Sequence, residues 1–120
     1  LMEDTMRFLL LAIFAVVLLQ ACSRPELSKQ AANVEVVTHM DRKDCTNLGP
    51  VFGKGGGSFG GSMISDEKLM EYASNDLRNH AADKGANMVV AGPHQMSQSG
   101  GKGGGQTSTS TVTGVAYKCP

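Results

Sequence analysis

A stretch of twelve consecutive apolar residues, from Phe8 to Leu19, is the feature that most restricts how this chain can fold. As a helix it is too short for the roughly twenty residues that a bilayer span needs, and its length is typical of an export signal. Glu3 and Asp4 would make the preceding leader acidic, whereas a start at Met6 leaves the α-amino group and Arg7 as the positive flank that export requires. We therefore predict that translation begins at Met6 and that residues 1–21 are leader and signal peptide.

The apolar run ends in Leu19-Gln20-Ala21-Cys22, which resembles the lipobox of bacterial lipoprotein signals. In such signals the cysteine thiol accepts a diacylglyceryl group, and the amine freed by cleavage takes a further acyl chain in many bacteria. More than one acyl chain makes membrane anchoring stable. We expect lipidation at Cys22 and, by the same resemblance, delivery to the outer membrane with the domain facing the periplasm. The alternatives are an uncleaved anchor or an ordinary secretory signal followed by a coincidental cysteine.

The three cysteines of the chain would leave an odd thiol in an exported protein. If Cys22 carries lipid, Cys45 and Cys119 remain to form a disulfide. That disulfide would close a loop of roughly 75 residues and stabilise the fold by on the order of 4 kcal/mol, which matters for a small core with few aromatic residues. A metal pair or a redox-active thiol is the alternative, but neither cysteine lies in a Cys-x-x-Cys spacing. We predict the disulfide.

The mature chain divides into a lipidated cysteine with a short tether, residues 22–33, and one domain, residues 34–120. A first strand is expected around Val34 and Val36, and a second from Leu48 to Phe52, where Pro50 indicates an edge strand or a bulge. A glycine-rich loop, residues 53–62, is expected to follow.

A helix of about nineteen residues is predicted between Ser65, a good N-cap, and Gly85, a good helix stop. Its apolar residues share one face at helical spacing: Leu69, Met70, Ala73, Leu77 and Ala81. Met88 to Ala91 then reads as a buried strand and Thr107 to Cys119 as a last strand. The order ββαββ predicts a small α+β domain with one helix packed on a mixed sheet.

If the second and third strands share a sheet, the intervening helix makes them parallel, and both glycine-rich segments, 53–62 and 99–106, leave the sheet at the same end. Ligands usually bind at the carboxyl ends of parallel strands. We therefore expect interaction loops at this end, with Lys54, Phe59 and Lys102 as the candidate residues. The lysine of the first segment is followed by glycine, not by Ser or Thr, so the segment lacks the phosphate-loop pattern.

Charge and side-chain chemistry restrict the function classes. Eleven basic residues balance eleven acidic ones without a basic stripe, which disfavours nucleic acid as a partner. Asp76 and His80, four apart on the helix, are interpreted as structural because His80 falls within the apolar arc, so no catalytic set is expected. We expect no cofactor and a non-catalytic envelope protein with an envelope protein partner. The alternative is a copper- or zinc-binding protein that uses His94, Met96 and His39.

The domain also resembles a family of small proteobacterial lipoproteins known only as a domain of unknown function. The resemblance rests on three motifs: Asp44-Cys45-x-x-Leu48-Gly49-x-Val51-x-Gly53, Asn75-Asp76-Leu77-Arg78-Asn79-x-Ala81-Ala82-x-x-Gly85-Ala86-Asn87-x-Val89, and Gly114-x-Ala116-Tyr117-x-Cys119. More distantly, the pattern is similar to the Rcs-pathway outer-membrane sensor lipoprotein. This chain differs from the sensor in having one cysteine pair, no long proline-rich linker and two glycine tracts. The resemblance implies an envelope module whose shared residues are structural.

Overall fold

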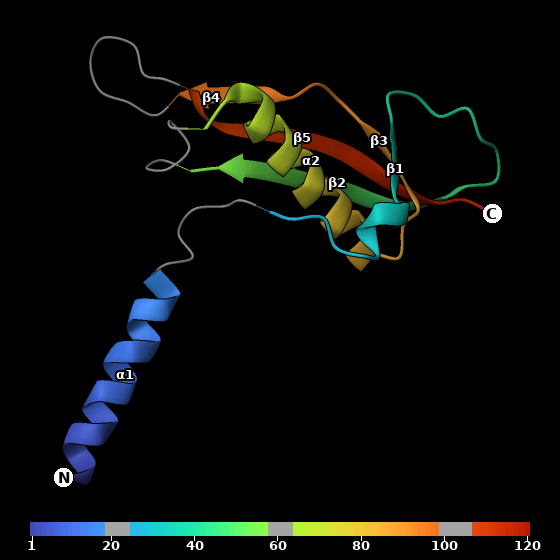
Figure 1. The fold of residues 1–120 in the computed structure, drawn as a ribbon. Coiled ribbons are helices and arrows are strands. Elements are labelled where there is room, and N and C mark those ends of the chain that lie inside the picture. The colour runs from blue at the N-terminus through green and yellow to red at the C-terminus, as the bar shows by residue number, and fades with distance from the viewer. Residues whose placement is uncertain (19–24, 58–63, 99–106) are drawn as a thin grey trace.

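The structure is a computed structural model that describes residues 1–18, 25–57, 64–98 and 107–120 (Figure 1). Its helices are α1 (Met2–Leu18), α2 (Asp66–Asp83) and the short 3-10 helix η1 (Ala31–Asn33). Its strands are β1 (Glu35–Val37), β2 (Thr46–Gly56), β3 (Met88–Ala91), β4 (Gln95–Gln98) and β5 (Thr107–Lys118). The predicted small α+β domain, with one helix packed on a mixed sheet, is confirmed. Strand β4 is additional to the predicted order.

The strands form one mixed sheet in the order β1-β3-β5-β2, and β4 pairs with β5 beyond the end of β3. Strand β1 is parallel to β3, whereas β2, β3 and β4 are all antiparallel to β5. Strands β2 and β3 therefore run in the same direction, as predicted, with β5 between them. Pro50 lies on the edge strand β2 close to a register shift between Asn47 and Gly49, which satisfies both interpretations of this proline.

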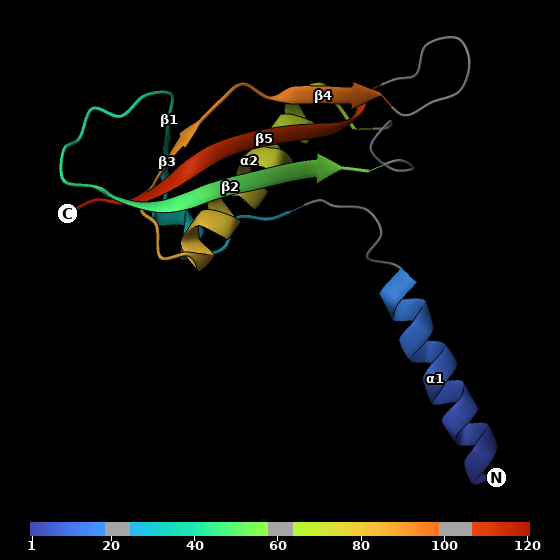
Figure 2. The same cartoon turned by 180° about the vertical axis from the view of Figure 1, so that it is seen from behind.

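Helix α2 covers one face of the sheet, and its ends are those that the sequence predicts (Figures 1 and 2). The Ser65 hydroxyl accepts a hydrogen bond from the Lys68 N–H at 3.3 Å. At the other end, Gly85 takes a φ of 81°, and the N–H groups of Gly85 and Ala86 donate to the carbonyls of Ala82 and Ala81. The core-facing side chains of the helix are fully buried: Leu69, Ala73, Leu77 and Ala81.

The glycines at 53–56 belong to strand β2, so the prediction of a loop over residues 53–62 is wrong for its first part. These glycines let α2 lie directly on the strand. A Cβ atom on Gly53 would clash with the Ala73 carbonyl oxygen and lie 2.7 Å from Leu77 Cβ. A Cβ atom on Gly55 would lie 2.7 Å from the Ala73 nitrogen. Close helix packing, not loop flexibility, explains why glycine occupies alternate positions here.

Residues 25–33, predicted as part of a tether, are hydrogen bonded to α2. The Asn79 side chain accepts from the Ser28 N–H at 2.9 Å and donates to the Glu26 carbonyl at 2.7 Å. The Arg78 guanidinium donates to the carbonyls of Val34 and Ala32 at 3.0 and 3.1 Å. Polar side chains of α2 thus replace the backbone partners that this irregular segment lacks.

Over residues 1–15, the side chains of helix α1 lie outside the core of the domain. Each of residues 1–15 is exposed, including apolar side chains such as Phe8 (75%) and Leu11 (66%). Within the described ranges, no helix is both long enough and apolar enough to cross a membrane.

Candidate functional site

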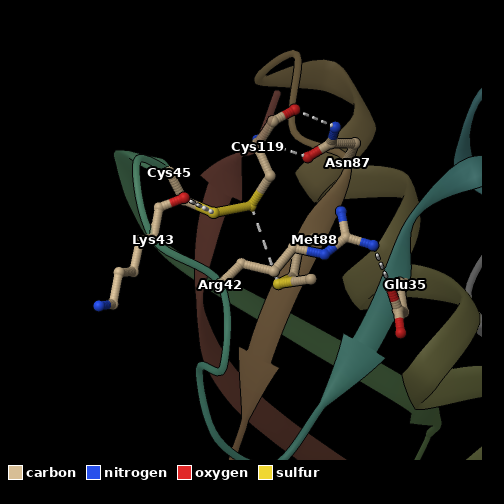
Figure 3. Close-up of a disulfide and its surroundings, with 7 residues drawn as sticks. All are labelled: Glu35, Arg42, Lys43, Cys45, Asn87, Met88 and Cys119. Carbon is tan, nitrogen blue, oxygen red and sulfur yellow. Dashed lines mark hydrogen bonds and ion pairs between the residues drawn. A yellow bond between two sulfur atoms is a disulfide. The ribbon is translucent and has the colours of Figure 1, made fainter.

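A disulfide joins Cys45 to Cys119 at the end of the sheet where β2 begins, as predicted (Figure 3). Its position is fixed by Asn87, whose side-chain amide donates to the Cys119 carbonyl and accepts from the Cys119 N–H, both at 2.8 Å. The Met88 sulfur lies 3.9 Å from Cys119 Sγ. This is a van der Waals contact, since a disulfide sulfur carries no proton. The Asn87 side chain therefore acts as a clamp on the end of β5. This clamp gives the asparagine of Gly85-Ala86-Asn87 a structural role.

Asp76 and His80 bind the outer edge of β2. The Asp76 carboxylate accepts from the Lys54 N–H at 2.9 Å, and His80 Nδ1 lies 2.6 Å from the Phe52 carbonyl oxygen, to which it donates. The two side chains approach each other to 3.6 Å. Together they satisfy backbone groups of an edge strand that would otherwise face solvent. These contacts favour the structural interpretation of the pair, but the expected place of His80 within the apolar arc is wrong, because 49% of its side chain is exposed.

A β-bulge between β3 and β4 directs His94 toward the helix. The Gly92 N–H donates to the Thr113 carbonyl at 3.0 Å, and Gln95 is paired with Thr111. Two residues, Pro93 and His94, therefore lie opposite the single residue Val112. The His94 ring lies between α2 and β5, with Nε2 3.3 Å from Ser74 Oγ and Nδ1 3.0 Å from Ser110 Oγ.

A cavity of about 220 Å³ lies beside His94, between β1, α2 and the bulge. Most of its lining is aliphatic: Val36, Val37, Leu77, Ala91 and Val112. Thr38, Ser74, Gly92 and His94 complete the lining, so no charged side chain contributes to it. Val36 is 42% exposed although it points to the helix side of the sheet, because β1 extends past the cover that α2 provides. The cavity combines apolar walls with a few polar groups.

The imidazole of His94 is suited to stay neutral at this position. Burial lowers its pKa from the ordinary value of 6.5, because the charged ring is poorly solvated there. Each serine hydroxyl can donate or accept, so the pair fits either neutral tautomer. His94 therefore supplies the cavity with a neutral polar group that is held in one orientation.

The three residues proposed as metal ligands do not form an evident site. Both nitrogens of His94 are hydrogen bonded, and His39 lies on the β1–β2 connection, 3.2 Å from Asp41. Met96 is 37% exposed on β4. Across residues 1–18, 25–57, 64–98 and 107–120, no three His, Cys, Asp or Glu side chains are close enough to hold one ion. The metal-binding alternative stays a prediction.

The candidate interaction loops are placed only at their ends. Lys54 is an exposed residue of β2, whereas Phe59, Lys102 and Cys22 lie outside the described residues. The Gly57 N–H donates to the Ser108 carbonyl at 3.1 Å, and Gln98 pairs with Thr107. The residues that flank both glycine-rich segments therefore meet at one end of the sheet, as the sequence predicts (Figure 1).

The sequence singles out His94 but does not indicate which residues surround it. Its partners Ser74 and Ser110 are 20 and 16 residues away, and neither belongs to a recognisable motif. The local signal was Gly92-Pro93, a dipeptide that interrupts a strand and is compatible with a bulge.

The fold and these contacts define a small, disulfide-bonded α+β domain. Polar side chains of its helix α2 form hydrogen bonds with backbone groups of the same domain. The chain belongs to the family described as a domain of unknown function (DUF4156), whose model matches residues 25–119. It is 31% identical over 109 residues to the uncharacterized protein YjeI of Escherichia coli K12, covering 88% of this chain and 90% of that protein. The YjeI protein of Shigella flexneri matches to the same extent. No solved structure matches the chain.

Proposed function

We propose that this chain is a non-catalytic lipoprotein of the cell envelope, anchored through Cys22 in the outer membrane and facing the periplasm, whose domain binds another envelope component. The observation that carries the proposal is the Cys45–Cys119 disulfide, because disulfides of small domains form and persist in oxidising compartments. The apolar side chains of α1, which are exposed over residues 1–15, support a signal peptide that is removed.

The polar side chains of α2 are engaged with backbone groups of the domain, which favours a binding role over catalysis. Asn75, Arg78 and Asn79 bind the backbone of residues 25–34, and Asp76 and His80 bind that of β2. Ser74 and His94 resemble a nucleophile with its base. Ser74, however, lies within α2, where the neighbouring N–H groups are engaged in the helix and cannot stabilise an oxyanion.

The anchor and the disulfide are tested together by intact mass spectrometry of the membrane-fraction protein after thiol alkylation without reductant. We expect cleavage before Cys22, added acyl chains and no alkylated thiol in the wild type. Cys22→Ser should abolish the acylation, and Cys45→Ser should make Cys119 available to alkylation as a positive control. An unacylated Cys22 in the wild type, or an alkylated Cys45 and Cys119, would contradict the proposal.

The binding role is tested by purifying the lipidated protein in mild detergent after crosslinking in cells. A specific envelope protein should co-purify with the wild type and be lost with Cys22→Ser, because the anchor confines the domain to the partner's membrane. Absence of any specific partner would count against the binding role. The distant similarity to the Rcs-pathway outer-membrane sensor lipoprotein stays a separate prediction.

A further inference from the structure

Among the described residues, strand β4 has one edge that no other strand pairs with. Strand β1 pairs with the outer side of β3, over Glu35–Met88 to Val37–Val90, and the chain then turns away at Thr38. Beyond the bulge, β4 pairs with β5 on one side, and no described strand pairs with its other side. Figure 1 shows β3 and β4 along the same side of β5, with β1 beside β3 at the end of the sheet away from β4.

The register identifies which backbone groups are free at this edge. The Thr113 carbonyl accepts from Gly92, so the odd-numbered residues of β5 face β3 and β4. Gln95 and Ser97, opposite Thr111 and Thr109, therefore bond to β5, and the N–H and C=O of Met96 face outward. Strand β4 contains no charge and no proline, and its protection as an edge is limited to its short length and to the irregularities on either side of it, the bulge at His94 and the register shift between Ser97 and Gln98.

The cavity beside His94 opens at the start of this free edge. Its walls come from the last residues of β1, Val36 and Val37, and from the residues that lead into β4, Ala91, Gly92 and His94. An extended backbone placed beside β4 would thus pass the cavity with one side chain. Aliphatic walls without charge favour an aliphatic side chain there.

We propose that the edge of β4 and the adjoining cavity form a docking site for an extended, uncharged peptide segment of a partner protein. The segment adds a strand to β4 through the outward N–H and C=O of Met96 and inserts one aliphatic side chain into the cavity beside His94. The outward backbone groups of Met96 and the uncharged, mostly aliphatic lining of the cavity select this occupant. The inference rests on the proposed function only in treating the domain as a binding module.

The test uses the mature, disulfide-bonded protein in detergent and a phage-displayed library of random eight-residue peptides. Enriched peptides should carry an aliphatic residue flanked by uncharged residues. The best peptide should slow hydrogen exchange at the Met96 amide and shift the methyl signals of Val112. Met96→Pro should weaken its binding about tenfold or more, because one or two hydrogen bonds are lost. Met96→Leu, which keeps the backbone groups, is the matched control.

Val36→Asp tests the cavity independently, because it places a charge at the mouth through an exposed position and should also weaken binding. No enrichment, or binding that both variants leave unchanged, overturns the proposal. So does self-association of the protein that Met96→Pro abolishes, since the occupant is then a second copy. Decanoate that binds Met96→Pro and wild type equally, with the same Val112 shifts and in competition with the peptide, identifies a site for small apolar molecules instead. None of these outcomes affects the mass measurement of Cys22, so the two proposals fail separately.

Discussion

His94 links the helix and the sheet at the bulge between β3 and β4. Because burial lowers its pKa from 6.5, protonation favours the unfolded chain over the folded one. The stability that neutral His94 contributes is complete above pH 6.5 and is lost as the pH falls through the lower pKa of the folded state. Urea unfolding of the wild type between pH 8 and pH 5 should show this decline. His94→Gln should flatten it while costing about 1 kcal/mol at pH 8 for a lost hydrogen bond.

His39 provides the matched control for this pH experiment. Its side chain is 74% exposed and lies on the connection between β1 and β2, away from the core contacts of α2. His39→Gln should leave the pH dependence of the unfolding free energy as it is in the wild type. A profile that is equally steep in His94→Gln and the wild type would show that the cavity histidine is not the group responsible.

Substitution by alanine should affect stability strongly at Gly53 and very little at Gly92. A methyl group on Gly53 would meet the backbone and side chains of α2, whereas the nearest atom to a methyl group on Gly92 is 3.8 Å away. Gly53→Ala should therefore lower the free energy of unfolding by about 3 kcal/mol, since the helix must move off the strand. Gly92→Ala should change it by less than about 0.5 kcal/mol. Thermal and urea unfolding of both variants measure the difference, and equal effects would refute the close packing of α2 on β2.

At the scale of elements, the sequence defined those whose signals are local. Ser65 and Gly85 bound α2 within a residue or two, and the apolar run Met88–Ala91 is β3 itself. The sequence does not predict strand β4, because Gln-Met-Ser-Gln has no apolar alternation. Among the described strands, only β5 pairs with it. The sequence predicts a loop over residues 53–56 because their conformation depends on the packing of α2, a tertiary contact that no local signal shows. The cavity depends on the bulge and on serines distant in sequence, so it could not be predicted.

The segment before β1 depends on α2 through side chains and gives a test at this scale. Asn79→Ala removes the acceptor of the Ser28 N–H and the donor to the Glu26 carbonyl. Hydrogen exchange at the Ser28 amide should become markedly faster, and trypsin should cleave faster after Lys29, while the amides of β5 keep their protection. Asn79→Asp retains the acceptor and should preserve protection at Ser28. Unchanged exchange in Asn79→Ala would show that residues 25–33 are held by other contacts.

At the scale of the whole molecule, the disulfide closes a loop that contains most of the domain. Cys45 and Cys119 are 74 residues apart, so β2, α2, β3, β4 and all of β5 lie between them. Most of the buried core lies inside this loop, with Ala31 and Val34 outside it. Asn87 binds the Cys119 backbone independently of the sulfur atoms. Native register at the end of β5 therefore does not depend on the disulfide alone, and the reduced chain is expected to fold.

Removal of the disulfide should accordingly destabilise the domain without changing its fold. The double variant Cys45→Ser/Cys119→Ser should lose about 4 kcal/mol of unfolding free energy in urea, because its unfolded state regains the entropy of a 74-residue loop. Reduction of the wild type should cause a similar loss, and the same reductant should leave the double variant unchanged. Near-native circular dichroism of the double variant in the absence of urea checks the fold. If Asn87→Ala alone unfolds the reduced chain, the clamp and not the disulfide sets the register. A loss below about 1 kcal/mol in the double variant would show that the disulfide marks the compartment of the protein without stabilising it.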